Sequence, residues 1–169
     1  MIGGARSGKS RTAEALVAAS GLPKTYIATA QPFDDEMRTR VAAHRADRGS
    51  GWCTIEAPRD LATALAQAAK GVVLIDCATL WLTNVILADG DVAAETASLL
   101  GALRASANPV VIVSNEVGMS IVPENALARR FRDDQGRLNQ ILAAQADLVV
   151  AVMAGLALVL KGQMPKAAP

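Results

Sequence analysis

Near the start of the chain, glycines, a lysine and a serine follow the spacing of a phosphate-binding loop. The pattern G-x-x-x-x-G-K-[ST] is matched by Gly3, Gly4, Ala5, Arg6, Ser7, Gly8, Lys9 and Ser10. In such a loop backbone N–H groups surround an anion, the Lys9 ammonium reaches the β- and γ-phosphates, and the Ser10 hydroxyl is placed to ligate Mg²⁺. A glycine-rich turn that only begins a helix is the alternative. The helix-forming stretch 12–19 follows at once and favours phosphate binding, because it would direct a helix N-terminus at the phosphates.

A second candidate for the same chemistry is Asp76, which ends the apolar stretch 72–75. In proteins with this loop, an acid at the end of a buried strand contacts Mg²⁺ directly or through water. We therefore expect Ser10 and Asp76 to be the metal contacts. The alternative is a carboxylate that caps the following helix.

The single histidine, His44, lies in a charged segment that we expect to be helical over 34–48. On such a helix Arg40 and Arg48 lie four residues to either side of it on one face, and Arg45 is next in sequence. Nearby cations disfavour the imidazolium, and a neutral imidazole can attack phosphorus while arginines hold the phosphates. The alternative is an ordinary surface histidine on a solvated helix.

The elements that must position these groups alternate between strands and helices. We expect strands at 25–30, 72–76, 109–114, 147–154 and 156–160, the last two joined by a turn at Gly155. We expect helices at 12–19, 34–48, 60–69, 91–107 and 124–146, the last with a junction at Gly136 if it is two helices. This order predicts a three-layer α/β domain with a mostly parallel sheet and a site at the carboxyl ends of its strands. Only Met1 and Ile2 precede the loop, so the strand that should lead into it is nearly absent, and we expect missing N-terminal residues or a misplaced start.

Length and composition bound the protein class. A chain of 169 residues, 51% hydrophobic, predicts a single domain over 1–169 with a flexible tail at 163–169. The formal charge of +1 gives no reason to expect nucleic-acid or membrane-surface binding. Cys53 and Cys77 form no C-x-x-C pair, which favours a reduced, cytoplasmic setting. The longest apolar run, 148–160, falls short of the roughly 20 residues of a membrane span.

Blocks of sequence along nearly the whole chain resemble the bifunctional adenosylcobinamide kinase/adenosylcobinamide-phosphate guanylyltransferase family. In chain order these blocks are 3–10, 26–29, 35–37, 41–45, 52–56, 76–84, 114–118, 121–125, 128–133 and 136–140. Their order is more specific than any single block.

The resemblance implies a P-loop NTPase domain similar to RecA, assembled as a homotrimer, with two activities at one nucleotide site. A nucleoside triphosphate, ATP or GTP, phosphorylates the aminopropanol hydroxyl of adenosylcobinamide. GTP then guanylylates the histidine that matches His44, pyrophosphate leaves, and GMP passes to adenosylcobinamide phosphate to give adenosylcobinamide-GDP. Besides the P-loop, the resemblance implies nucleotide contacts at Ala28, Thr29, Ala30, Arg45, Ala46, Asp47, Arg48, Glu56 and Asp76.

Several alternatives stay open. Asp76 and Glu116 are both candidates for the base that deprotonates the cobinamide hydroxyl, and Glu116 is equally well a structural carboxylate. Trp52 and Trp81 could stack on a corrin or guanine ring or pack in the core. Two rival functions are a plain P-loop small-molecule kinase, in which His44 has no role, and a non-catalytic nucleotide-binding module.

Overall fold

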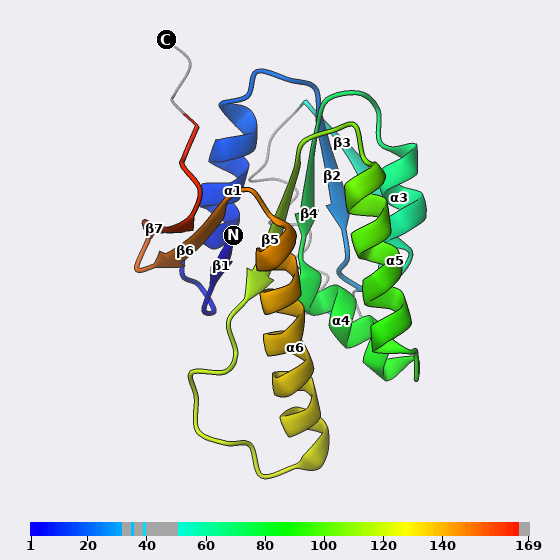
Figure 1. Cartoon of the computed structure of the whole chain (residues 1–169), viewed down its shortest axis with the longest axis vertical. Coiled ribbons are helices and arrows are strands. Elements are labelled where there is room, and N and C mark those ends of the chain that lie inside the picture. The colour runs from blue at the N-terminus through cyan, green and yellow to red at the C-terminus, as the bar shows by residue number, and fades with distance from the viewer. Residues whose placement is uncertain (32–34, 36–38, 40–50, 166–169) are drawn as a thin grey trace.

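The computed structural model describes residues 1–31, 35, 39 and 51–165, and across these it forms a seven-stranded sheet of order β3-β2-β4-β5-β1-β6-β7 (Figure 1). The strands are β1 (Ile2–Gly3), β2 (Lys24–Ala28), β3 (Trp52–Glu56), β4 (Val72–Asp76), β5 (Val110–Asn115), β6 (Val149–Met153) and β7 (Leu156–Lys161). Neighbouring strands of this sheet run parallel except β7, which is antiparallel to β6. The expected α/β fold with a mostly parallel sheet is confirmed.

Helices cover both faces of the sheet. They are α1 (Lys9–Ala18), α3 (Leu61–Gln67), α4 (Ala78–Leu87), α5 (Val92–Ala105) and α6 (Ala126–Gln145). Figure 1 shows α1 on one side of the sheet and α3, α4 and α5 on the other. α6 belongs to the second layer, because its Leu138 packs in the same core cluster as α3, α4 and α5.

Successive side chains of the central strands point to opposite faces of the sheet, so the core consists of two clusters, one on each face. Val72 and Leu74 of β4 pack in the cluster that contains Val17 of α1. Val73 and Ile75 of the same strand pack with α3, α4 and α5. Since both faces are buried, β4 is apolar at consecutive positions, which is why it is easily recognised in the sequence.

Polar side chains begin the helices of the second layer. The Asp60 carboxylate accepts from Thr63 N at the start of α3, and the Asn125 amide oxygen accepts from Ala128 N at the start of α6. Asp91 does the same for α5. Each cap satisfies a backbone donor that the helix itself leaves unpaired.

A junction at Gly136 is wrong, because α6 runs unbroken from Ala126 to Gln145. Phe131 and Leu142 pack on the core from either side of the glycine, and Gln135 and Leu138 are buried next to it. These contacts outweigh the roughly 1 kcal/mol by which glycine weakens a helix.

The strand that leads into the P-loop contributes two residues, as its short sequence suggests. Ile2 pairs with Ser114 of β5 and Ala151 of β6, so β1 lies inside the sheet. The expected helix at 34–48 falls outside the described residues, apart from positions 35 and 39. The last four residues of the expected tail do too.

Both tryptophan side chains pack against other residues of the fold. Trp81 is buried in α4 and its indole N–H donates to Arg59 O at 2.8 Å. Trp52 is the first residue of β3, where its ring meets Tyr26 edge-on at 6.0 Å and Lys24 Nζ lies 5.3 Å from its centroid. Trp52 is therefore at the amino end of a parallel strand, opposite to the edge where the strands end. This geometry favours the core interpretation over ring stacking.

Candidate functional site

The turn between β1 and α1 has the backbone that a phosphate-binding loop needs. Gly8 has a φ of 95°, a left-handed conformation that side chains disfavour. A Cβ on Gly3 would lie 2.5 Å from Val152 O, so the sheet leaves no room for a side chain there. Lys9 Nζ donates to Gly4 O at 3.2 Å, and this bond holds the ammonium against the loop. The two fixed glycines of the motif are thus explained by geometry.

The loop also offers groups that suit an anion. Lys9 and Ser10 are the first residues of α1, so the positive end of the helix dipole faces the space that the loop encloses. The Ser7 hydroxyl oxygen is buried and has no hydrogen-bond partner within the described part of the chain. A phosphate oxygen is a partner of the right kind for this hydroxyl.

Three of the expected site residues form one row across neighbouring strands. Ala28 of β2 pairs with Glu56 of β3 on one side and with Asp76 of β4 on the other. All three lie at the carboxyl edge, the edge of the sheet at which the parallel strands end. Asp76 faces the same side as α1, because Leu74, two residues earlier, packs on that helix. The Cα atoms of Glu56 and Asp76 are roughly 10 Å apart by strand spacing, and the residue between them, Ala28, has only a methyl side chain.

A buried hydroxyl positions the end of β4. Thr29 Oγ1 accepts from Cys77 N at 2.7 Å and donates to Cys77 O at 2.9 Å. Asn84 Nδ2 in turn donates to Thr29 O at 2.8 Å and to Pro58 O at 2.9 Å. Thr29 is fully buried, so its side chain is used within the protein to hold the residues beside Asp76. The role of Asn84 could not be predicted from spacing, although an amide in a largely apolar helix is a usable signal.

Asp76 does not cap the following helix. The N-cap of α4 is Cys77, whose Sγ accepts from Leu80 N at 3.5 Å. Burial and the negative charge of Asp76 raise the pKa of the Cys77 thiol to about 11, and the Lys9 ammonium acts in the opposite direction. Lys9 and Asp76 thus both act electrostatically at this position, which links the P-loop with the end of β4.

A buried polar network fixes the end of β5 beside the P-loop. Gln135 Nε2 donates to Ser114 Oγ at 3.0 Å, and Ser114 Oγ donates to Asn139 Oδ1 at 2.6 Å. Asn139 Nδ2 donates to Asn115 O at 3.0 Å, and Asn115 N donates to Thr79 Oγ1 at 2.8 Å. The network joins β5 to α4 and α6. Sequence reasoning missed Gln135 and Asn139, whose signal is two amides one helical turn apart.

Glu116 follows directly after β5. Its backbone N–H donates to Gly3 O at 3.0 Å, and its Oε1 accepts from Gly118 N at 2.6 Å. The carboxylate therefore has a structural contact in its own loop. Its role as a base stays a prediction.

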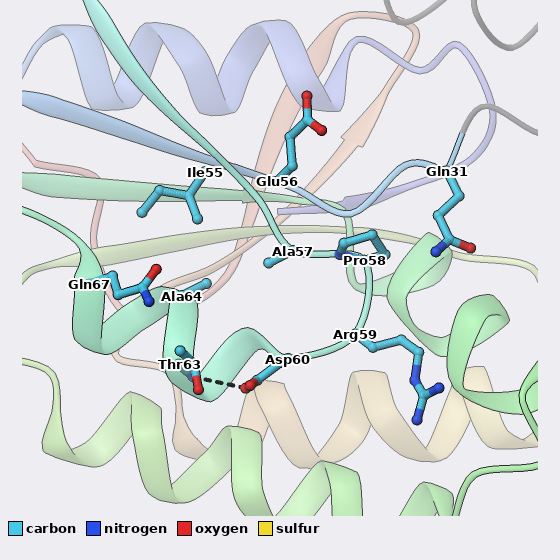
Figure 2. Close-up of a pocket in the computed structure, with 10 residues that line it drawn as sticks. All are labelled: Gln31, Ile55, Glu56, Ala57, Pro58, Arg59, Asp60, Thr63, Ala64 and Gln67. Atoms are coloured by element: carbon cyan, nitrogen blue, oxygen red, sulfur yellow. Dashed lines mark hydrogen bonds between the residues drawn. The ribbon is translucent and has the colours of Figure 1, made fainter.

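An open hollow of about 350 Å³ lies at the carboxyl end of β3 (Figure 2). It is lined by Gln31, Ile55, Glu56, Ala57, Pro58, Arg59, Asp60, Thr63, Ala64 and Gln67. Figure 2 shows Ile55 and Glu56 leaving β3 in different directions, as strand alternation requires. Three strands separate β3 from β1, so this hollow is distinct from the phosphate-binding loop, and Glu56 connects it to the row at the carboxyl edge.

The expected nucleophile and the residues after it lie outside the described residues: His44, Arg45, Ala46, Asp47 and Arg48. Ala30 is described and is partly buried beyond β2. In the described ranges no three His, Cys, Asp or Glu side chains gather in a way that could hold a metal. No described helix is long and apolar enough to cross a membrane.

Comparison with known proteins decides the family. Residues 1–160 match the CobU family model, described as cobinamide kinase / cobinamide phosphate guanyltransferase. The chain belongs to the CobU family. Relatives include the bifunctional adenosylcobalamin biosynthesis protein CobP of Pseudomonas aeruginosa, 46% identical over 167 residues, with 96% of each chain covered. The CobU proteins of Salmonella typhimurium and Escherichia coli are 44% and 42% identical, covering 95% of this chain and 98% of each relative.

A solved structure of isoflavone reductase aligns with a TM-score of 0.41 and 11% identity over 89% of this chain and 46% of that chain, too little to bear on fold or function.

Membership of the CobU family confirms the expected enzyme class. The protein is a nucleotide-using cobinamide kinase and cobinamide phosphate guanylyltransferase of cobalamin biosynthesis. The rival interpretation as a non-catalytic module is therefore wrong.

Proposed function

We propose that this CobU-family enzyme phosphorylates the aminopropanol hydroxyl of adenosylcobinamide with ATP or GTP, and then transfers GMP from GTP through His44 to give adenosylcobinamide-GDP. The observation that carries the proposal is the carboxyl edge of the sheet. There the P-loop with Lys9 and the row of Asp76, Ala28 and Glu56 face the same layer, that of α1.

For the kinase step, the chain must hold a triphosphate and neutralise its charge. The Lys9 ammonium, the Ser7 hydroxyl and the N-terminus of α1 supply donors and positive charge at one place. Mg²⁺ suits Ser10 and Asp76, because this ion prefers oxygen ligands and is commonly held by one or two protein groups together with substrate phosphates. When bound, Mg²⁺ neutralises negative charge on the β- and γ-phosphate oxygens. Asp76 and Glu116 are the two candidates for the base.

For the guanylyl step, the neutral His44 imidazole attacks the α-phosphorus of GTP. A nitrogen–phosphorus bond forms as the bond to pyrophosphate breaks. A phosphate oxygen of the cobinamide phosphate then attacks the same phosphorus, and the bond to His44 breaks. Covalent catalysis of this kind divides one difficult displacement into two easier ones. The proposed nucleotide contacts are Ala28, Thr29, Ala30, Arg45, Ala46, Asp47, Arg48 and Glu56. Thr29 would make its contact through its backbone, because its hydroxyl is already hydrogen-bonded to Cys77.

The test is to incubate the protein with Mg²⁺ and GTP labelled at the α-phosphate. We expect acid-labile, base-stable label on the protein that moves to cobinamide phosphate. His44→Ala should carry no label while some kinase activity remains, and Lys9→Ala should lose both activities. Lys70→Ala is the matched control, since Lys70 is exposed and follows α3.

Guanylyl transfer at the parent rate by His44→Ala would disprove the covalent route. If GTP binds and no label is found on the protein, the reaction is a direct displacement. We further propose a cytoplasmic homotrimer.

A further inference from the structure

Two asparagines lie near the two ends of β5, and their side chains are used differently. Asn108 precedes the strand, and its amide accepts from Gly71 N at 3.0 Å and donates to Ala69 O at 3.1 Å. Asn115 ends the strand, and its Oδ1 is buried without a hydrogen-bond partner among the residues that the structure describes. Because an unpaired buried acceptor is costly, such an oxygen points to a partner that arrives from outside the chain.

The backbone of Asn115 is held firmly without any help from that oxygen. Its N–H donates to Thr79 Oγ1 at 2.8 Å, and its carbonyl oxygen accepts from Asn139 Nδ2 at 3.0 Å. The next residue continues the attachment, since Glu116 N donates to Gly3 O at 3.0 Å. The unpaired Oδ1 is therefore carried on a rigid support that is bonded to the start of the P-loop.

The Asn115 side chain lies at the carboxyl edge, between the two parts of the proposed phosphate site. β5 lies between β4, which ends in Asp76, and β1, where Gly3 is the register partner of Asn115. Val113 packs in the α1 cluster, so alternation directs the side chain two residues later to the same face. Since Asp76 pairs with Val113, strand geometry puts the Cα atoms of Asp76 and Asn115 roughly 8 Å apart.

The kinase step brings a donor to this edge. The oxygens of a bound triphosphate are acceptors, so they do not pair with Oδ1. The attacking hydroxyl has an O–H to donate. We infer that Asn115 is a further catalytic residue of the kinase step, whose Oδ1 accepts from the corrinoid hydroxyl and holds the hydroxyl oxygen against the γ-phosphorus. The inference rests on the kinase reaction proposed above.

The side chain has the freedom that this role requires. Asn115 is partly exposed as a residue, and rotation about the soft bond between Cβ and Cγ turns Oδ1 toward an arriving substrate. While the hydroxyl donates to Oδ1, a lone pair of its oxygen is left to point at phosphorus.

In the transfer itself, a bond forms between the hydroxyl oxygen and the γ-phosphorus. The bond from that phosphorus to the β–γ bridging oxygen breaks, and the nucleoside diphosphate leaves. The amide does not take up the hydroxyl proton, which passes to a carboxylate, Asp76 or Glu116, as the new bond forms. Orientation of the hydroxyl favours the corrinoid over water as the acceptor of the phosphoryl group.

The test uses Asn115→Leu, which keeps the approximate shape of the side chain and removes the amide, with ATP and adenosylcobinamide as substrates. We expect kcat for corrinoid phosphorylation to fall roughly 10- to 100-fold, with little change in KM for ATP. ADP formed should exceed corrinoid phosphate formed, because water now competes for the γ-phosphate. Labelling by GTP at His44 should be unchanged, since that step takes place at the α-phosphorus.

Asn108→Leu is the matched control, because Asn108 is also partly buried and lies near the opposite end of β5. It should lower the unfolding temperature, since its amide is hydrogen-bonded, and keep ADP and corrinoid phosphate in equal amounts. Asn115→Leu should not lower the unfolding temperature, because the oxygen it removes has no partner in the described part of the chain. Asn115→Ala repeats the test without a bulky side chain and should also uncouple the reaction.

Three results would overturn the inference. Both Asn115 variants could phosphorylate the corrinoid at the parent rate. They could lose stability as Asn108→Leu does while ADP and product stay equal, which would make the role structural. Added Mg²⁺ could restore the parent rate, which would assign Oδ1 to a metal-bound water. Failure of the proposed function is distinguishable, because the parent itself would then form no corrinoid phosphate.

Discussion

Residues that do no chemistry hold the reactive groups at the carboxyl edge. Thr29 makes two hydrogen bonds to Cys77, at the junction between β4 and α4. Asn84 donates to Thr29 O and to Pro58 O, in the segment before α3. Asp76 is positioned by this arrangement. A substitution at Thr29 should therefore act on the position of the neighbouring carboxylate.

The two cysteines should differ sharply in reactivity. Cys53 is exposed, whereas Cys77 is buried and its thiol pKa is raised to about 11, chiefly by burial and then by Asp76. Near pH 8 only about one Cys77 in a thousand would be a thiolate, the reactive form. We expect iodoacetamide to modify Cys53 alone in the folded protein, as measured by intact mass.

Denatured protein should gain both adducts, and folded Cys53→Ser should gain none. Because the pKa is raised, reactivity at Cys77 should appear only as the pH approaches 11. A second adduct in folded protein near pH 8 would show that the junction after β4 opens to solvent.

Local spacing made part of this site predictable. Lys9 and Ser10 were identified because all the fixed positions of their motif lie within eight consecutive residues, 3–10. The row of Glu56, Ala28 and Asp76 could not be derived from spacing, because it depends on β2 pairing between β3 and β4. The roles of Glu56 and Ala28 were available only through family resemblance.

At the scale of elements, α6 shows how packing overrides a local signal. Gly136 is an unfavourable helix residue, yet a Cβ built on it meets nothing within 4 Å. We therefore expect Gly136→Ala to stabilise the protein by about 1 kcal/mol, through helix propensity and a less flexible unfolded chain. Thermal unfolding should shift upward by roughly 2–4 °C.

Gly3→Ala is the opposing control, since its Cβ would lie 2.5 Å from Val152 O and Ser7 Oγ. It should lower the unfolding temperature. A lowered temperature for Gly136→Ala would mean that the surface of α6 near this residue is covered by something in solution.

Some strands and helices could be predicted from the sequence and others could not. β4 was predicted at 72–76 because its apolar residues are continuous and end in an acid. α4 was not predicted, because seven of its residues are buried and no polar stripe marks a helical period. β3 at the other end of the sheet was not predicted as a strand either, since its exposed and partly buried residues follow no strict alternation.

For the whole molecule, assembly should be visible as stability that depends on concentration. If the proposed homotrimer is the native state, mass action stabilises the protein as it is concentrated. We expect the unfolding temperature of the parent to rise across an about hundredfold range of concentration, measured by scanning fluorimetry. An unfolding temperature that stays constant over this range would contradict the proposed homotrimer.

The sequence could not reveal which apolar side chains stay exposed. Ile121 and Leu156 are apolar like the core residues, and only the fold shows that they are exposed. The expectation of a trimer came from resemblance alone.

The placement of β1 also sets an order of events during synthesis on the ribosome. Ile2 and Gly3 emerge well before their partners, which are Ser114 and Asn115 of β5 and Ala151 of β6, more than a hundred residues later. The loop that follows β1 can take its final shape only when these strands have been made. An incomplete nascent chain should therefore be unable to capture GTP, so that translation of nearly the whole chain must precede nucleotide binding.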